Sequence, residues 1–385
     1  MTKETAHRRY CLVGPTYPYR GGISHYNTCL IRELSGRGET LAINFTRLYP
    51  DFLFPGKTQL DESARPLSAE SLRIVDSLNP LSWIRAGAAA ARFRPDAVLV
   101  QWWHPFFAPA MATLCAVAKA RSRTKILFIC HNVLPHERSL VDEALARTAF
   151  AAADAFLVQS GEDRRTLSRL KPRAPAVVHP HPIYDFFASE GLSREDARAA
   201  IGEGAGPLVL FFGYVRGYKG LRHLIEAMPL LRKRVPARLL VVGEFYDDPA
   251  PYEELVGSLG LSEAVRFVNR YVGNEEVEGF FAASDLVVLP YVSATQSGIV
   301  QIAIAFDRPA IVTEVGGLPE AVVPERTGFV VPPRDPVALA AAMARFFEEG
   351  WAARMAPHFA AEKRRFSWSA MADAVDGLVD AAGRA

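Results

Sequence analysis

A chain of 385 residues is long for one hydrophobic core, so we expect two domains of roughly 150 to 200 residues each. Half of the residues are apolar and 22% are charged, an ordinary globular composition, and no run reaches the ~18 apolar residues of a membrane helix. The four cysteines include no C-x-x-C pair, which argues against a disulfide framework or a cysteine-based metal site. The start "MTKETAHRRY" lacks the apolar segment of a signal peptide. We therefore expect a cytoplasmic protein, soluble or peripheral at the inner face of the membrane.

The formal net charge of +2 hides an asymmetry between the two halves of the chain. Residues 1–185 contain 24 Lys and Arg against 16 Asp and Glu, a net +8, which leaves 20 against 26, a net −6, for the rest. A basic first half suits anionic lipid or an anionic acceptor, which makes peripheral membrane association one interpretation. The alternative is an uneven distribution of solvated surface charge.

The first half of the chain alternates short apolar runs with helical patterns. Continuous apolar runs indicate strands buried on both faces of a parallel sheet, and the alternation with helices indicates βαβ units. The predicted strands are 10–14, 41–45, 97–102, 125–130, 155–159 and 176–180, with predicted helices at 24–35, 105–121 and 139–152.

The same rhythm restarts in the second half. The predicted strands there are 207–213, 238–243, 265–269, 286–291, 310–314 and 328–332, and the last predicted helix covers 369–382. Prolines and glycines between Pro180 and Pro207 indicate a hinge. The fold class is therefore α/β, with two Rossmann-like doubly wound domains facing across a cleft. Ligands of such sheets bind beyond the carboxyl ends of the strands, so this cleft is the expected site.

A glycine loop, "GPTYPYRGGISHYN" (14–27), follows the first strand. Gly21 and Gly22 stand just before a helix, where a diphosphate or sugar can approach the main chain closely. The loop is not G-x-G-x-x-G, and no acidic residue follows at the distance a dinucleotide fingerprint requires. A simple turn is the alternative interpretation.

His131 directly follows the apolar strand "KILFIC". A polar residue at the carboxyl end of a parallel strand lies where site residues of such sheets gather, and its imidazole can bind a sugar hydroxyl. A structural histidine is the alternative. His104, in "QWWHPFF", is a weaker candidate of the same kind.

The stretch "FFGYVRGYKGLRHLIEAM" (211–228) ends a strand at Gly213 and begins a helix near Lys219 or Gly220. Arg216 and Lys219 then lie beside a helix N-terminus, where side chains and backbone both favour an anion such as phosphate. Two exposed loop cations are the alternative.

The stretch "ATQSGIVQIAIAFDRP" (294–309) predicts a buried helix that begins at Ser297 or Gly298. The first amides of that helix, around Ile299, need partners. Ser297 can cap one of them, and a bound diphosphate can satisfy several, with Gly298 allowing its approach and Gln296 on the polar rim. The alternative is a capped core helix.

Taken together, these motifs resemble those of the GT-B glycosyltransferases, most closely the retaining enzymes of family 4 (glycosyl transferases group 1). The resemblance covers nearly the whole chain. Besides the loops above, it rests on "AASDLVVLPY" (282–291), "RPAIVTEVGGLPEAV" (308–322), "TGFVVPPRDPVALAAAM" (327–343) and "FSW" (366–368).

The resemblance implies a domain order and roles for individual residues. Residues 1–185 would form an N-terminal acceptor-side domain, 186–366 a C-terminal domain that binds the nucleotide sugar, and 367–385 a helix that crosses back to the N-terminal domain. Arg216 and Lys219 would neutralise the departing diphosphate, and His131 would contact the donor sugar. Glu320, in "GGLPE", would contact the ribose. The other residues that would contribute to substrate binding are Gly21, Gly22, Gly213, Gln296, Ser297, Gly298 and Ile299.

Two departures from the family pattern concern the donor. Many relatives carry two glutamates separated by seven residues, and here alanine, threonine, isoleucine and alanine occupy the places where they would fall. Gln296 is the candidate substitute for the sugar contact. Arg216 and Lys219 are separated by two residues, where relatives often have four. Donor identity therefore stays open.

The sequence thus predicts a metal-independent, retaining glycosyltransferase, without a cofactor, that moves a sugar from a nucleotide diphosphate sugar to a glycan, lipid-linked or metabolite acceptor. The alternatives are a GT-B nucleotide-sugar epimerase or hydrolase and a non-catalytic partner protein that binds nucleotide sugars. No strongly basic domain with interleaved aromatic residues is present, which argues against nucleic-acid binding.

Overall fold

The computed structural model describes residues 7–54, 57–135, 139, 141–188 and 191–384. In this part of the chain the fold consists of two compact units. The first unit contains the described residues up to Glu62, Pro66–Pro180 and the helix that begins at Trp368. The second contains Ser63–Arg65 and the described residues of His181–Ser367.

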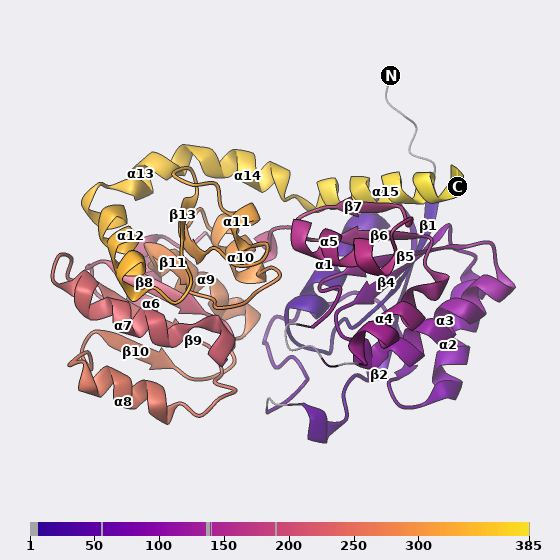
Figure 1. Ribbon diagram of the computed structural model, residues 1–385, viewed down its shortest axis with the longest axis horizontal. Helices are drawn as coiled ribbons and strands as arrows, with labels where there is room; N and C mark the ends of the chain where they lie inside the picture. Colours follow the sequence, from indigo (N-terminus) through magenta and orange to yellow (C-terminus); the bar gives the residue numbers. More distant parts are fainter. Residues whose placement is uncertain (1–6, 55–56, 136–138, 140, 189–190, 385) are drawn as a thin grey trace. The chain divides into compact units, whose positions relative to one another are not determined.

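The first unit is built on a parallel sheet with the order β3-β2-β1-β4-β5-β6-β7 (Figure 1). Its described strands are β1 (Arg8–Val13), β2 (Gly38–Arg47), β3 (Leu72–Asp76), β4 (Ala97–Trp102), β5 (Lys125–Cys130), β6 (Ala155–Val158) and β7 (Ala176–Val178). All six residues of β4 are buried, as expected for a central strand covered on both faces. The expected strands are present, and β3 is an additional one at the edge of the sheet.

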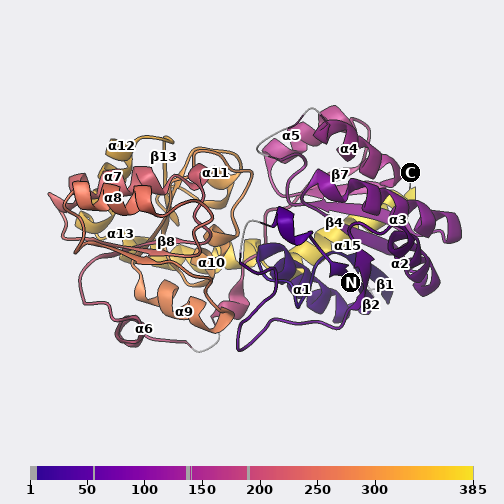
Figure 2. The ribbon, with the colours of Figure 1, turned by 90° about the horizontal axis from the view of Figure 1, so that it is seen from below.

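Helices cover both faces of this sheet (Figures 1 and 2). Helix α1 (Gly22–Ser35) packs beside α15 (Trp368–Arg384), while α2 (Pro80–Phe93) packs on α3 (Ala108–Arg121), which in turn contacts α4 (Asp142–Ala149). The remaining helix, α5 (Gly161–Leu170), leads into β7, and short 3-10 turns occur at Asp51–Leu53, Pro105–Phe107 and Phe150–Ala152.

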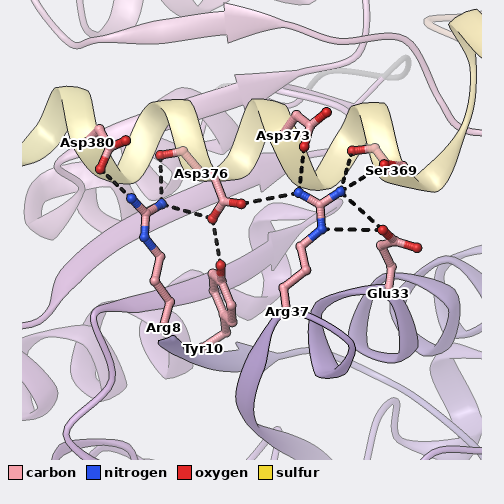
Figure 3. A network of polar contacts seen from close by, with 8 residues as sticks. All are labelled: Arg8, Tyr10, Glu33, Arg37, Ser369, Asp373, Asp376 and Asp380. Carbon is pink, nitrogen blue, oxygen red and sulfur yellow. Dashed lines mark hydrogen bonds and ion pairs between the residues drawn. The ribbon is translucent and has the colours of Figure 1, made fainter. Parts of the chain in front are cut away.

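Helix α15 is held to the first unit by a network of ion pairs and hydrogen bonds (Figure 3). Asp376 accepts hydrogen bonds from Arg8 Nη1 at 2.9 Å and from Tyr10 Oη at 2.6 Å. Arg37 Nη2 donates to the Ser369 carbonyl at 2.9 Å, and its guanidinium also pairs with Asp373. Residues distant in sequence therefore anchor the C-terminal helix beside α1.

The second unit has its own parallel sheet, in the order β10-β9-β8-β11-β12-β13. Its described strands are β8 (Leu208–Phe212), β9 (Arg238–Val242), β10 (Val265–Val268), β11 (Leu286–Leu289), β12 (Ala310–Thr313) and β13 (Gly328–Val331), so the expected strands are present here as well. Both units are therefore doubly wound Rossmann-like domains.

In Figure 2, α7 (Leu221–Arg232), α8 (Ala250–Ser258) and α12 (Pro336–Glu348) lie on one face of the second sheet, and α6 (Arg194–Ile201) and α9 (Asn274–Ala283) on the other. The further described helices are α10 (Gly298–Ala305), α11 (Leu318–Ala321), α13 (Trp351–Met355) and α14 (Phe359–Arg365), with 3-10 turns at Asp185–Phe187, Gly217–Lys219 and Ala356–His358. None of the helices in the described part of the chain combines the length and apolar character needed to cross a bilayer.

The observed division differs in detail from the boundaries expected at 185/186 and 366/367. The N-terminal part of the first unit extends to Pro180, and the C-terminal helix, which belongs to the same unit, begins at Trp368. The short segment Ser63–Arg65 belongs to the second unit, because Ser63 Oγ accepts a hydrogen bond from the Asn274 amide at 3.0 Å and the Glu275 carboxylate accepts one from the Ala64 amide at 3.1 Å.

Candidate active site

The candidate site of the second unit lies where the strand order changes direction. Strand β8 pairs with β9 on one side and with β11 on the other, so the loops that follow β8 and β11 leave neighbouring strands at the same edge of the sheet. In open α/β sheets such a switch point is the usual place for a ligand. The predicted phosphate loop follows β8, and the predicted "TQSG" cluster follows β11.

Gly213 is the point at which these two loops meet. Its φ of 100° is in the region that disfavours residues other than glycine. A Cβ placed there would lie 3.0 Å from Lys219 Nζ and 3.4 Å from Ile299 Cδ1. The ammonium from the β8–α7 loop and the side chain from the first turn of α10 therefore both pack over the main chain of Gly213.

Burial and a like charge govern the ionisation of Lys219. The side chain is buried, and burial, together with the positive charge of Arg216, lowers the pKa of Lys219 from 10.5 to about 7. Arg216 packs its guanidinium 5.0 Å from the centre of the Tyr246 ring, and Lys219 Nζ lies 5.7 Å from the centre of the Tyr291 ring. In the described part of the chain, neither cation has a carboxylate at ion-pair distance. The pair is thus an uncompensated cationic site.

The N-terminus of α10 is adjacent to this site. Ser297 caps the helix by accepting a hydrogen bond from the Ile299 amide at 3.2 Å, and its hydroxyl lies 3.3 Å from Tyr291 Oη. The helix itself is buried from Val300 to Ala305. The structure therefore contains the capped, buried helix predicted from the sequence, next to the aromatic ring that Lys219 faces.

Gly298 has a packing role that the sequence did not indicate. A Cβ at this position would lie 3.0 Å from Cε2 of the buried Tyr184 ring. Tyr184 Oη is in turn 3.1 Å from Nε2 of the buried His181. A larger residue at this position would therefore have to displace the Tyr184 ring slightly.

Gln296 and Glu320 lie on either side of a close backbone contact. A Cβ at Gly316 would lie 1.6 Å from the Ala294 carbonyl oxygen, so the segment before α11 packs directly on the "TQSG" loop. The Gly317 amide donates to the Thr295 carbonyl at 2.8 Å. Gln296 Oε1 is buried without a hydrogen-bond partner, whereas the Glu320 side chain is exposed on α11. A buried, unpaired amide oxygen is suited to a ligand hydroxyl.

In the first unit, His131 follows β5 and is buried in a polar cluster. His131 Nε2 lies 2.8 Å from Oε1 of Gln101, which is the fifth residue of β4, and the ring is edge-on to Tyr26 at 4.6 Å between centroids. Gln101 is fully buried and its amide nitrogen has no hydrogen-bond partner. The His131 imidazole is therefore held in place by residues from β4 and α1.

The glycine loop of the first unit leads into the same cluster. Gly21, with φ of 101°, immediately precedes α1, and Gly22 is the first residue of that helix. At Gly14 a Cβ would lie 2.6 Å from Asn27 Nδ2 and 2.7 Å from Gln101 Cγ. The loop therefore needs glycine at Gly14 for packing and at Gly21 for backbone conformation.

Several site residues were missed by the sequence analysis. Gln101 carried a usable signal, because it is a polar residue near the carboxyl end of an apolar strand. Tyr246 and Tyr184 carried none, since each contacts a residue distant in sequence. His104, the weaker candidate, is exposed, and its Nδ1 accepts a hydrogen bond from the Phe106 amide at 3.1 Å, which makes it a local cap.

The groups that meet at the candidate site of the second unit are suited to binding an anion. Arg216 and Lys219, which have no carboxylate at ion-pair distance among the described residues, lie beside the amides at the start of α10. Both kinds of group are hydrogen-bond donors that favour an anion. Across the described residues, no group of three or more His, Cys, Asp or Glu is arranged to hold a metal ion.

Two Rossmann-like parallel sheets with a switch-point site define the GT-B class of glycosyltransferases. Two family profiles match the chain, "Glycosyl transferase 4-like domain" over residues 21–201 and "Glycosyl transferases group 1" over residues 206–349. The chain belongs to the group 1 glycosyltransferases of the family 4 type.

Among curated proteins, the chain is similar to the D-inositol 3-phosphate glycosyltransferases of Streptomyces scabiei and Corynebacterium urealyticum. It is 31% identical to the first over 60% of its own length and 54% of that protein. It is 30% identical to the second over 60% of its own length and 55% of that protein. The match thus spans about half the length of these relatives.

Solved structures share the fold over nearly the whole chain. Sucrose-phosphate synthase from Thermosynechococcus elongatus superposes with a TM-score of 0.74 at 21% identity, covering 96% of this chain and 98% of that one. The Anabaena protein HepE, in complex with UDP and glucose, superposes with a TM-score of 0.75 at 16% identity, covering 97% and 100%. At these identities the likeness establishes the fold.

Proposed function

We propose that this protein is a retaining glycosyltransferase that needs neither metal nor cofactor and transfers a sugar from a nucleotide diphosphate sugar to a glycan, lipid-linked or metabolite acceptor. The observation that carries the proposal is the cationic site of the second unit. Lys219 is buried, close enough to Arg216 to have its pKa lowered, and has no counter-charge within the described residues. Such a site is stabilised by a bound dianion.

In the proposed reaction the glycosyl C–O bond to the diphosphate breaks while the acceptor oxygen forms the new bond, and the acceptor proton leaves with the diphosphate. Negative charge develops on the leaving oxygen as that bond breaks. Lys219 and Arg216, with the first amides of α10, stabilise this charge more than they stabilise the intact donor. The remaining assignments stay predictions: His131 would contact the sugar, Gly21 and Gly22 the diphosphate, and Glu320 the ribose.

The comparisons favour a uridine nucleotide as the first donor to test. HepE of Anabaena was solved with UDP and with UDP-glucose, and the curated relatives are named as glycosyltransferases acting on D-inositol 3-phosphate. Both observations concern other proteins. They support a nucleotide sugar as donor and a phosphorylated polyol as one acceptor to include.

The proposed function is tested in two stages. A thermal-shift screen over nucleoside diphosphates and their sugars identifies the donor, because a ligand that binds only the folded state raises Tm. Product analysis with and without acceptors then separates the alternatives. Transfer only when acceptor is present supports the proposal, whereas epimer or free sugar from donor alone, or binding with no turnover on any acceptor, would replace it.

We predict that binding of a nucleoside diphosphate takes up a proton at about pH 8. The free protein has a Lys219 pKa of about 7, so the amine is mostly neutral at that pH, and a bound dianion raises its pKa and protonates it. Affinity should therefore fall as pH rises above about 7. Calorimetry in buffers of different ionisation enthalpy measures the uptake directly.

The control for this prediction is Lys219→Met, which should bind more weakly and take up no proton. Equal proton uptake by the two proteins, or none by the wild type, would mean that Lys219 does not meet the phosphate.

A further inference from the structure

The loop after β9 pairs with the cationic loop after β8. The Val215 amide donates a hydrogen bond to the Glu244 carbonyl at 2.9 Å, and the Tyr246 amide donates one to the Val215 carbonyl at 3.1 Å. Val215 and Phe245 thereby form a parallel bridge beyond the ends of the two strands. Because Tyr246 is bonded to the residue that precedes Arg216, the backbone places this tyrosine beside the arginine.

Gly243 allows the two loops to come this close. Its φ is 144°, and a Cβ there would lie 2.3 Å from the Gly213 carbonyl oxygen. No side chain fits at that separation, so the two backbones are in direct contact. The loop that carries Tyr246 therefore rests on the same glycine that Lys219 covers from another side.

The ring of Tyr246 contacts both Arg216 and a second tyrosine. The guanidinium carbon of Arg216 lies over the Tyr246 ring, 5.0 Å from its centre. The Tyr214 ring centre is 4.6 Å from the Tyr246 ring centre, with 33° between the ring planes. All three side chains are half-buried. Packing against Tyr214 holds the Tyr246 ring in place, which makes its face a fixed platform for the guanidinium.

The position of the Arg216 side chain depends on this ring. Within the described part of the chain, no hydrogen bond or ion pair holds the Arg216 guanidinium. An arginine without such partners samples many rotamers, and ordering it on binding reduces affinity. A cation–π contact orders the guanidinium and keeps its charge available. A carboxylate in the same place would instead compete with the phosphate for the arginine.

We propose that Tyr246 is a positioning residue of the diphosphate site, whose ring, backed by Tyr214, holds the Arg216 guanidinium ready for the phosphate without neutralising it. The N–H donors of a guanidinium lie in its plane, so stacking on a ring leaves them able to bind two phosphate oxygens. The inference rests on the proposed function, because it requires that Arg216 meets the diphosphate. It adds the loop between β9 and α8 to the groups that form the site.

The test measures binding of inorganic pyrophosphate by calorimetry, since this probe carries the diphosphate group without a base or a sugar. Tyr246→Leu should raise the Kd about tenfold, because the ring under the guanidinium is lost. Tyr246→Phe removes only the hydroxyl group and should keep the Kd within about twofold of the wild-type value. Urea unfolding of both variants shows whether the fold is intact.

A double-mutant cycle shows whether Tyr246 acts through the arginine. Arg216→Ala should weaken pyrophosphate binding at least as much as Tyr246→Leu, and adding Tyr246→Leu to Arg216→Ala should cause no further loss. Tyr252→Leu is the matched control for loss of a ring. Tyr252 packs on Phe245, with 5.7 Å between the ring centres, and its replacement should leave the Kd unchanged.

Three results would overturn the inference alone. Tyr246→Leu could bind pyrophosphate like the wild type while Arg216→Ala is impaired, Tyr246→Phe could lose as much affinity as Tyr246→Leu, or the two losses could add in the double variant. Failure of the proposed phosphate site gives a different result. In that case the wild type binds no pyrophosphate, or Arg216→Ala and Lys219→Met both bind it as the wild type does, and the role of Tyr246 is refuted together with the site.

Discussion

Replacing Lys219 with methionine is expected to lower kcat/KM for sugar transfer on the order of a hundredfold. A charge-assisted hydrogen bond contributes roughly 1.5–3 kcal/mol, and the contribution is largest where charge develops on the leaving diphosphate. Methionine keeps much of the side-chain volume over Gly213, so the loss reflects the missing charge. Steady-state kinetics with the identified donor and acceptor measure it.

The same substitution is expected to stabilise the ligand-free protein at pH 7. The folded state lowers the pKa of Lys219 from 10.5 to about 7, so between these values the unfolded chain binds more protons and wild-type stability rises with pH. Methionine removes this dependence. In urea unfolding, the variant should exceed the wild type at pH 7, and the gap should shrink as pH approaches 10.5.

Lys233, an exposed residue of the same unit, supplies the control. Lys233→Met should alter neither kinetics nor the pH dependence of stability. A Lys219→Met protein with full activity would refute the assignment of Lys219 to the diphosphate.

Gly213→Ala is expected to reduce both stability and activity, with a loss of activity of tenfold or more. The φ of 100° strains any L-residue, at a cost of about 1–3 kcal/mol. The new methyl group would also lie 3.0 Å from Lys219 Nζ and displace the ammonium from its position. Urea unfolding and donor titration measure the two effects separately.

Gly217→Ala, in the same loop, is the matched control. A Cβ there has Asp247 Oδ2 as its nearest neighbour, at 3.9 Å, and the residue has no positive φ, so the change should be nearly neutral. Equal effects of the two substitutions would show that general loop rigidity, and not the contact with Lys219, explains the result.

The strands were predictable because a central parallel strand must be apolar on both faces. "AVLVQW" and "KILFIC" are continuous apolar runs, and the structure has β4 at Ala97–Trp102 and β5 at Lys125–Cys130. The missed strand β3, "LRIVD", lies at the sheet edge with Leu72 and Arg73 exposed, so its sequence carries no such run.

The loops that form the candidate site could be predicted from the sequence, whereas the contacts between their side chains were harder to predict. Charge and glycine in "GYVRGYKG" indicated a cationic loop between β8 and α7, and the apolar helix with a polar start indicated the capped N-terminus of α10; the structure contains both elements, while anion binding stays a prediction. That Lys219 and Ile299 meet over Gly213 depends on the pairing of β8 with β11, which no local pattern reveals. For the same reason, no local pattern indicated that the ring of Tyr184 packs against Gly298.

The most direct test of the cationic site is a crystal structure of the protein with a bound nucleoside diphosphate. The proposal predicts a terminal phosphoryl oxygen at about 2.8 Å from Lys219 Nζ, with Arg216 and the first amides of α10 contacting the same diphosphate. A diphosphate bound away from both cations, with Lys219 still enclosed over Gly213, would contradict it.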